Sequence, residues 1–312
     1  MQQQTVLIVP TLNAGPLWCE WLDAFERQTV QPELLIVDSG SRDDTVEQAE
    51  RRGFRVVRIN KAQFNHGGTR QWAMSLVPSA DVVMFMTQDA VLATSDAIAR
   101  LLAVFDDLNI AAAYGRQLPR PGAGVIETHA RLFNYGQVDY VVGPEDIARL
   151  GIKAAFFSNS FAAYRRSALN AVGGFPEHLI LGEDTVVAGR LLLTGHRLAY
   201  CSKATVFHSH AYSAGQEFAR YFDVGVLHGR ERWMLERLGV PEGEGTRFLR
   251  SEMEYVMRQK PILLFDVLRR TACKYAGYRL GRMEQMLPIW LKRHIGMHKE
   301  FWVVRHVQDT QG

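Results

Sequence analysis

The residues best suited to chemistry in this chain are acidic groups that follow apolar, strand-like runs. Asp38 closes the run ELLIVD, and Asp89 follows VVMFMT within the sequence TQDA. A carboxylate at such a position can accept a hydrogen bond from a uracil or thymine base. It can also hold Mg²⁺ or Mn²⁺, hard ions that prefer oxygen ligands and bridge protein to phosphate. Each carboxylate would serve equally well in a turn or as a helix cap, so neither is decisive alone.

An acidic pair, Glu183 with Asp184, opens the amphipathic stretch LGEDTVVAGRLLLTGHRLAY. The helix dipole favours acidic residues at a helix start, which explains part of this pattern. The pair also offers a carboxylate that can act as a general base and take a proton from a hydroxyl group.

Two further motifs carry polar groups. In VFHSHAYS, His208 and His210 lie two residues apart and therefore on one side of an extended segment. Neutral imidazole is a common metal ligand, so His208 could complete a site with an acid, and His210 is the weaker candidate. FNHGGTRQWAM combines paired glycines, which allow close backbone approach, with Arg70, which can reach phosphate. Structural histidines and plain glycine turns are the competing interpretations.

The elements that must position these residues alternate between strands and helices. We predict strands over 5–10, 33–38, 55–60 and 81–89, and helices over 14–28, 43–53, 67–77 and 95–105. This rhythm indicates a doubly wound, largely parallel sheet, whose ligands bind at the carboxyl ends of the strands. The polar residues that fall at those ends are Thr11, Asn13, Asp38, Gln88 and Asp89.

Composition narrows the class of protein. The chain has 312 residues, 47% of them hydrophobic and 22% charged, which is ordinary for a globular protein. Its net charge of +3 and its motifs give no reason to expect nucleic-acid binding. The three cysteines are widely spaced, which favours a reducing cytoplasm over a zinc site or a disulfide framework. We find no signal peptide or membrane-spanning run, so any membrane contact is expected to be peripheral.

The character of the chain changes near residue 212. We predict a helix over 216–237, a break at PEGEG (241–245) and aromatic, basic helices over 246–310. Residues 212–312 hold 17 Lys and Arg against 12 Asp and Glu. Cationic and aromatic groups at helical spacing suit a membrane surface, and suit equally a dimer interface or a solvated helix. We therefore expect a catalytic domain over 1–212 and a mainly helical extension over 213–312.

Taken in order, these segments resemble the family 2 glycosyltransferases, which have the GT-A fold. The resemblance covers about residues 4–230 and rests on PTLN, IVDSGSRDDT, GGTRQWAM, MTQDA, SNSFAAYRRSALNAVGGF and GEDTVVAGRLLLTGHRLAY. Three motifs resemble the rhamnosyltransferase branch of that family in particular: FNHGGTRQ, TQDA and HSHAYSAGQEFARYFDVG. The fold implied is a doubly wound mixed α/β sheet flanked by helices, with a C-terminal helical extension.

The resemblance also implies an activity. It implies metal-dependent, inverting transfer of L-rhamnose from dTDP-L-rhamnose to a hydroxyl of a bacterial cell-surface glycan or lipid-linked acceptor. The reaction would use Mg²⁺ or Mn²⁺ and take place in the cytoplasm or on the inner face of the membrane. A homodimer is left open.

Each residue that matches the family pattern receives an expected role. The residues implied to bind the nucleoside, the nucleotide or its phosphates are Thr11, Asn13, Asp38, Asn65, Gly68 and Arg70. Gln88 and Asn159 are assigned to the donor pocket, and Gln88 stands where many relatives have an acidic residue. The metal is assigned to Asp89 and His208. Asp184 is the implied catalytic base, and Glu183 is expected to position sugar hydroxyls.

Three other interpretations compete with this one. A nicotinamide-dependent oxidoreductase would carry G-x-G-x-x-G after the first strand, where this chain has PTLNAGP. A catalytically silent nucleotide-binding protein would keep the fold without using the acidic pair. A glycosyltransferase with another donor, UDP-galactofuranose or a UDP-hexose, would share much of the nucleoside pocket.

Overall fold

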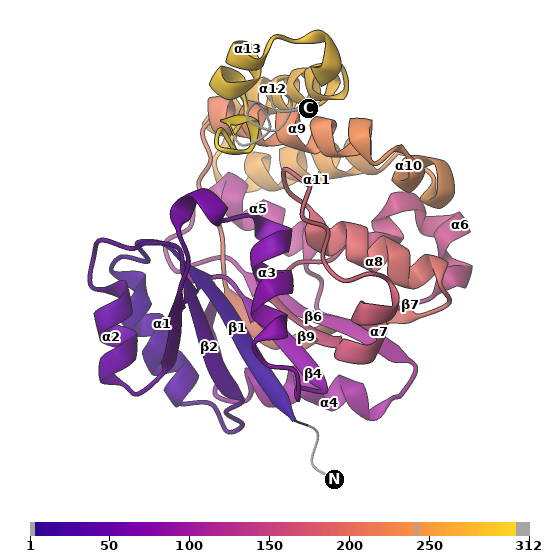
Figure 1. Ribbon diagram of the computed structural model, residues 1–312. Coiled ribbons are helices and arrows are strands. Elements are labelled where there is room, and N and C mark those ends of the chain that lie inside the picture. The colour runs from indigo at the N-terminus through magenta and orange to yellow at the C-terminus, as the bar shows by residue number, and fades with distance from the viewer. Residues whose placement is uncertain (1–3, 241–242, 304–312) are drawn as a thin grey trace.

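The computed structural model describes residues 4–240 and 243–303, and a mixed sheet with helices on both faces lies at its centre (Figure 1). The strands are β1 (Thr5–Thr11), β2 (Glu33–Asp38), β3 (Arg55–Arg58), β4 (Val82–Met86), β5 (Val91–Leu92), β6 (Ile110–Leu118), β7 (Tyr140–Val142), β8 (Phe161–Arg165) and β9 (Arg197–Phe207). The helices around the sheet are α1 (Leu17–Glu26), α2 (Thr45–Arg51), α3 (His66–Ser75), α4 (Ala97–Ala103), α5 (Val125–Asn134), α6 (Ile147–Leu150), α7 (Arg166–Ala171) and α8 (Glu183–Leu193).

The sheet has the strand order β3-β2-β1-β4-β8-β6-β9-β5, with β7 paired to β9. The pairs β1–β2, β2–β3, β1–β4 and β6–β9 are parallel, whereas the pairs of β8 with β4 and β6, and of β9 with β5 and β7, are antiparallel. The expectation of a largely parallel sheet is therefore wrong beyond β4, and the expected mixed sheet is confirmed. The apolar run of β8 reads like any other buried strand, so its direction was not visible in the sequence.

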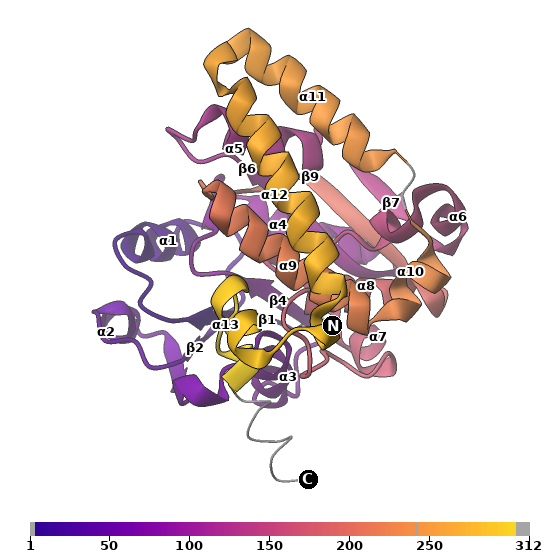
Figure 2. The ribbon, with the colours of Figure 1, turned by 90° about the horizontal axis from the view of Figure 1, so that it is seen from above.

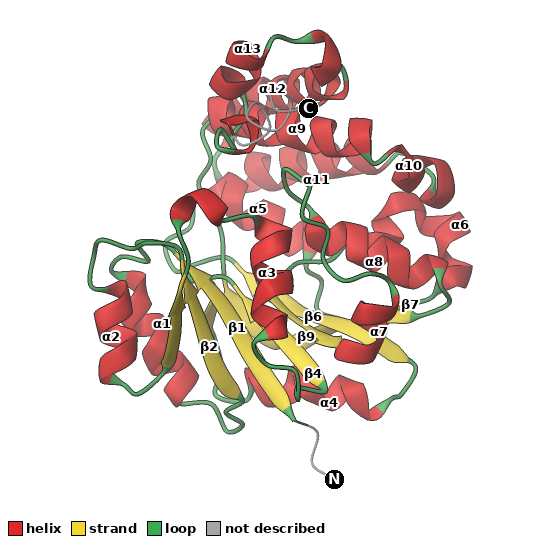
Figure 3. Cartoon of the chain, in the orientation of Figure 1, coloured by secondary structure: helices red, strands yellow, loops and turns green. Residues whose placement is uncertain are grey.

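Two apolar layers hold the helices against the sheet. One face packs on α1, α2 and α4 through a layer that includes Trp18, Trp21 and Ile98. The other face packs on α3, α7 and α8, for example through Met74 and Leu191 (Figure 3). These strands are apolar on both sides because both faces are covered, which explains their continuous hydrophobic runs.

Strand directions bring the functional segments to one edge of the sheet. Because β8 is antiparallel to both β4 and β6, the strands β1, β2, β4, β6 and β9 all point the same way. Their carboxyl ends therefore meet at a single edge, together with the amino end of β8. Asp38 ends β2, while Asp89 and His208 follow β4 and β9 within three residues.

A layer of helices covers this edge. It contains α9 (Ala214–Arg230), α10 (Arg232–Leu238), α11 (Glu244–Gln259), α12 (Leu264–Arg282) and α13 (Ile289–Ile295). Figure 2, seen from above, shows α12 lying along α9 on the outside of the molecule. The helices expected over 216–237 and 246–310 are present as several shorter ones. The first is interrupted at Glu231, between α9 and α10, and α11 begins at Glu244, inside the break expected over 241–245. Residues 241–242 and 304–310 lie outside the described residues. No helix in the described parts of the chain is long and apolar enough to cross a bilayer.

Glycines allow α9 and α12 to approach closely. A Cβ atom on Gly281 would lie 2.0 Å from the carbonyl oxygen of Phe222, and one on Gly225 would lie 2.3 Å from that of Tyr278. Neither contact tolerates a side chain, so the two backbones touch directly. The position of α12 is thus tightly fixed relative to α9.

Candidate functional site

The loops after β1 and β2 are joined by hydrogen bonds that centre on Asp38. Its carboxylate is 1% exposed and accepts hydrogen bonds from the Thr11 hydroxyl at 3.1 Å and from the backbone N–H groups of Gly40 and Ser41, both at 2.9 Å. Asn13, which has a positive φ of 45°, accepts a hydrogen bond from the Arg42 N–H at 2.7 Å. The structure thus brings Thr11, Asn13 and Asp38 together, and their contact with a nucleoside stays a prediction.

Gln88 links this pair of loops to the turn after β4. Its Oε1 accepts a hydrogen bond from the Leu12 N–H at 2.7 Å, and its Nε2 donates to the Leu12 carbonyl at 3.1 Å. Only an amide can both accept and donate in this way, so a carboxylate at position 88 would lose one bond. This contact gives the amide a structural reason to stand where many relatives have an acid. The assignment of Gln88 to the donor pocket stays a prediction.

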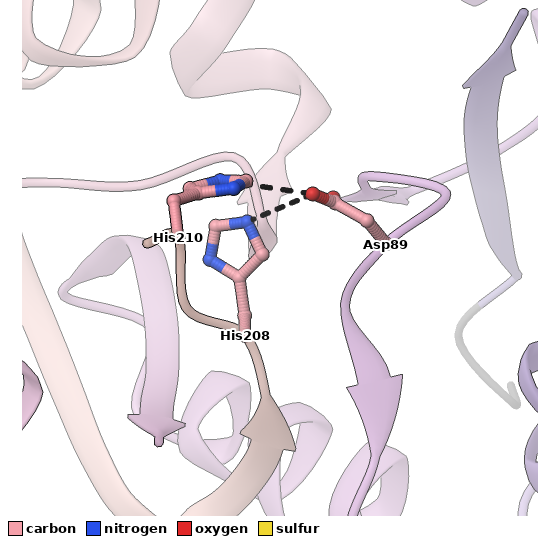
Figure 4. A group of neighbouring side chains, drawn as sticks. All are labelled: Asp89, His208 and His210. Atoms are coloured by element: carbon pink, nitrogen blue, oxygen red, sulfur yellow. Dashed lines mark ion pairs between the residues drawn. The ribbon is translucent and has the colours of Figure 1, made fainter. Parts of the chain in front are cut away.

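Asp89, His208 and His210 form a compact group beside this turn. The Asp89 Oδ2 lies 3.4 Å from the His208 Nε2 and 3.6 Å from the His210 Nε2 (Figure 4). One ligand atom from each residue lies within 4.8 Å of the other two. One carboxylate and two imidazoles at this spacing make a donor set that fits a divalent cation.

The surroundings of this group shift the pKa values of its members. Burial raises the pKa of Asp89, but the two histidines outweigh it, and the net pKa lies below its usual range. The pKa of His210 is lowered to about 4, first by burial and then by the neighbouring imidazole of His208. His210 is therefore neutral at pH 7 and keeps a lone pair for a metal. We expected Asp89 and His208 to share a site, and their proximity supports that assignment.

The loop that carries the two histidines is held by the helical layer. Tyr212 stacks on His210 with 5.2 Å between the ring centroids, and Arg220 of α9 lies over the Tyr212 ring. Arg270 of α12 donates a hydrogen bond to the Tyr212 carbonyl. Both helices therefore contact the chain that follows the histidines.

The acidic pair at the start of α8 is divided between two environments. Glu183 is 6% exposed and lies 3.0 Å from the Arg70 guanidinium, and it accepts a hydrogen bond from the Asn159 amide at 3.1 Å. Asp184 is half-buried and accepts backbone hydrogen bonds from Asn159 at 3.0 Å and from Thr185 at 2.8 Å. No cation among the described residues forms an ion pair with Asp184.

These environments move the two pKa values in opposite directions. Burial alone would raise the pKa of Glu183, but Arg70, His66 and Asn159 outweigh it and lower the pKa. The pKa of Asp184 rises to about 6, first because of burial and then because of the negative charge on Glu183. Neighbouring carboxylates with separated pKa values commonly mark a catalytic pair.

The glycine pair of the HGG motif lets α3 take the position that places Arg70 near Glu183. A Cβ atom on Gly67 would lie 1.9 Å from the Pro176 carbonyl oxygen, so only glycine lets α3 pack against the loop before α8. The Asn65 side chain caps α3 by accepting a hydrogen bond from the Gly68 N–H at 2.8 Å. Arg70 is thereby directed to Glu183. The predicted contacts of Asn65, Gly68 and Arg70 with a nucleotide remain predictions.

Two of the acids that the sequence separates are connected in the fold by hydrogen bonds. Asp38 contacts Thr11, whose neighbour Leu12 is bonded to Gln88, and Asp89 follows directly. The carboxylates at 38 and 89 thus belong to one continuous network at the edge of the sheet.

His210 is the residue whose place in the site the sequence signalled only weakly. It was expected to be the lesser candidate of the two histidines, and it lies nearly as close to Asp89 as His208 does. Its signal was the spacing of HSH, which places both imidazoles on one side of the chain.

The chain is similar to known proteins in both sequence and fold. Residues 6–173 match the family described as glycosyl transferase family 2. The chain is 46% identical over 298 residues, 95% of each chain, to the O-antigen chain rhamnosyltransferases WbaN of Salmonella anatum and RfbN of Salmonella typhimurium.

A solved structure similar to this fold is the mannosyltransferase PcManGT from Pyrobaculum calidifontis in complex with GDP-Man and Mn²⁺. It has a TM-score of 0.56 at 18% identity, and the match covers 99% of this chain and 88% of that one. The fold is therefore the GT-A fold that the resemblance implied. The chain is a glycosyltransferase and belongs to glycosyl transferase family 2.

Proposed function

We propose that this enzyme transfers L-rhamnose from dTDP-L-rhamnose to a hydroxyl group of a growing O-antigen chain, with inversion at the anomeric carbon. The names of the two curated relatives, at 46% identity over 95% of the chain, support the sugar and the acceptor class. The observation that carries the chemistry is the contrast within the acidic pair. Arg70 neutralises Glu183 at 3.0 Å, whereas Asp184 has a pKa of about 6 and is free to accept a proton.

The proposed reaction is a single displacement. Asp184 takes the proton of the acceptor hydroxyl, and the resulting oxygen forms a bond to the anomeric carbon of the donor. The bond from that carbon to the diphosphate breaks at the same time, and dTDP leaves with the electron pair. A base with a pKa near the working pH is the most effective for this transfer. Glu183, held by Arg70 and Asn159, has the fixed position expected of a group that orients a sugar hydroxyl.

The divalent cation is assigned to Asp89, His208 and His210. When bound, it supplies positive charge to the diphosphate and favours its departure. Two imidazoles with one carboxylate suit Mn²⁺ better than Mg²⁺, which prefers an all-oxygen shell. We therefore propose Mn²⁺ as the working ion. The complex of PcManGT with GDP-Man and Mn²⁺ is consistent with this choice.

A donor screen tests the proposal. The purified protein with Mn²⁺ is titrated with dTDP-L-rhamnose, dTDP-glucose, a UDP-hexose, UDP-galactofuranose and GDP-mannose. Transfer to lipid-linked O-antigen intermediates is then monitored by measuring the nucleotide diphosphate that is released. We expect dTDP-L-rhamnose to bind most tightly and to be the donor that turns over. The anomeric configuration of the product, read by NMR, should be opposite to that of the donor. Retention of configuration, or preferential turnover of a UDP or GDP sugar, would overturn the proposal.

The outer face of α12 is also suited to an acceptor that is carried by a membrane. This stripe consists of Phe265, Leu268, Tyr275, Arg279 and Met283, which recur at helical spacing and are all exposed. Residues 256–303 hold ten Lys and Arg against three Asp and Glu, a net charge of +7 in a chain of net charge +3. We propose that this face rests on the anionic headgroups of a membrane that carries the acceptor.

Vesicle flotation tests this contact with the full-length protein. Vesicles of phosphatidylcholine alone are compared with vesicles that contain phosphatidylglycerol, each at low and high salt. We expect flotation with the anionic vesicles at low salt, weakened by high salt because exposed charges are screened. A protein that floats with neither has no membrane face. A second copy of the chain covering the stripe would appear in sedimentation as a dimer and would also exclude this contact.

A further inference from the structure

A buried glutamine on β6 lies behind the proposed metal group. Gln117 is 2% exposed, and its Oε1 lies 2.9 Å from the Nδ1 of His208. This nitrogen is on the far side of the imidazole from Asp89, because the Nε2 is the atom that lies 3.4 Å from the Asp89 carboxylate.

The partners of Gln117 fix which way its amide points. Arg131 of α5 donates a hydrogen bond to the Oε1, and the Nε2 donates to the Ser158 hydroxyl at 2.9 Å. A guanidinium can only donate, so the atom beside Arg131 must be the amide oxygen. That oxygen can only accept, and the His208 Nδ1 must therefore carry the proton. The imidazole then presents the lone pair of its Nε2 to the metal group.

From this geometry we infer that Gln117 is a positioning residue, which holds His208 in the tautomer and orientation that bind the divalent cation. The inference rests on the proposed metal site. Outer partners of this kind orient metal-bound histidines, and their loss commonly weakens metal binding by about 10–100-fold. No described contact of Gln117 involves a substrate-binding group directly, so its effect passes through His208.

The same side chain joins the metal group to the acidic pair. Ser158, which accepts the hydrogen bond from Gln117, is followed by Asn159, whose N–H donates to Asp184 at 3.0 Å. Hydrogen bonds therefore link His208 through Gln117 and Ser158 to the segment that contacts the proposed base. Gln117 thus contacts both a proposed metal ligand and the residue that precedes Asn159.

Mn²⁺ binding, measured by EPR of the free ion in the absence of donor, tests the inference without reference to turnover. We expect Gln117→Leu to raise the Kd for Mn²⁺ by about 10–100-fold. Gln117→Glu keeps an acceptor for the His208 Nδ1 and should bind Mn²⁺ within a few-fold of the wild type. Gln28→Leu is the matched control, because Gln28 is another buried amide, 5% exposed, with hydrogen bonds to Ala24, Thr94 and Ile98 far along the chain from the histidines.

The outcomes separate this inference from the proposed function. If Gln117→Leu binds Mn²⁺ as tightly as the wild type, the positioning role is wrong and the metal site stands. If Gln28→Leu weakens binding equally, loss of stability explains the effect and the inference also fails. A wild-type protein that binds no Mn²⁺ would overturn both. Should Gln117→Leu not fold, Gln117→Glu decides, since weak Mn²⁺ binding by this isosteric variant contradicts the inference.

Discussion

The edge of the sheet and the outer face of α12 hold their charged side chains in different ways. At the edge, Asp38, Glu183 and His208 each have fixed partners within 3.1 Å. On the outer face of α12, Arg279 has no ion pair among the described residues, and Phe265 and Tyr275 are 77% and 67% exposed. Each side chain at the edge of the sheet has its own specific partner, whereas the outer face of α12 presents several similar exposed groups. Single substitutions should therefore have large effects at the edge and small, additive effects on the face.

Replacing the proposed base should give the largest effect. Asp184→Asn keeps the size of the side chain but cannot take a proton, so we expect turnover to fall by about 10²–10⁴-fold. Binding of dTDP should change little, because Asp184 contacts backbone groups of Asn159 and Thr185. Steady-state rates and dTDP titration measure the two quantities. Asp44→Asn is the control, because Asp44 is an exposed carboxylate that directly precedes α2. An Asp184→Asn enzyme that retains most of its turnover would remove the assignment.

Replacing the proposed metal ligands should give the next largest effect. We expect His210→Ala and Asp89→Asn to raise the Kd for Mn²⁺ by at least about tenfold, since even the loss of an outer partner commonly costs about 10–100-fold. Asp89→Asn should be the more severe change, because it removes the only carboxylate of the group. EPR of free Mn²⁺ measures both variants. If His210→Ala binds Mn²⁺ like the wild type, the site consists of Asp89 and His208 alone.

The contact between α9 and α12 tests how firmly the two regions are joined. Gly281→Ala places a methyl group where only 2.0 Å separates it from the Phe222 carbonyl oxygen. We expect the free energy of unfolding to fall by about 1–3 kcal/mol, the usual cost of overpacking. Urea denaturation measures it. Gly245→Ala in α11 meets nothing within 4 Å and should be neutral or slightly stabilising. Equal stability of the two variants would mean that the helices can separate freely.

The pH dependence of kcat/KM tests whether Asp184, at the edge of the sheet, acts as the base. The pKa of Asp184 is raised to about 6, and the group acts as a base only when it has lost its proton. At saturating Mn²⁺ the rate should therefore fall about tenfold per unit as the pH drops below 6, and level off above it. A profile that stays flat from about pH 7 to about pH 5 would contradict a base with this pKa.

The smallest effect is expected on the outer face of α12. Arg279→Gln removes one cation from a surface with several, and each such charge is worth about 1 kcal/mol near an anionic membrane. We expect roughly fivefold weaker binding to vesicles that contain phosphatidylglycerol, and unchanged turnover with a soluble acceptor. Lys203→Gln, an exposed cation on β9 outside the helical layer, is the control. Equal losses from both variants would show that only net charge matters.

Much of the sheet could be predicted because its signals are local. The apolar runs of β1, β2 and β4 locate Asp38 and Asp89 at strand ends, and parallel strands bring such ends together. The reversal of β8 could not be predicted, since a buried strand has the same apolar pattern in either direction. Contacts such as Gln117 with His208, which are 91 residues apart, depend on the pairing of β6 with β9. The difference between the pKa values of Glu183 and Asp184 depends on Arg70. The close packing of α3 at Gly67 is what places Arg70 beside Glu183.

Residues 208–213 form the short connection between the last strand and the first helix of the upper layer, and Arg270 and Arg220 contact it through Tyr212. A protein shortened to residues 1–212 would retain every residue assigned to the donor, the cation and the base. The two imidazoles that we propose as metal ligands would nevertheless lie at a free chain end, without the helices whose side chains contact this segment. In the proposed mechanism, catalysis therefore depends on the helical layer as well as on the sheet, because the layer that we propose to contact the membrane also contacts the segment that carries the two histidines.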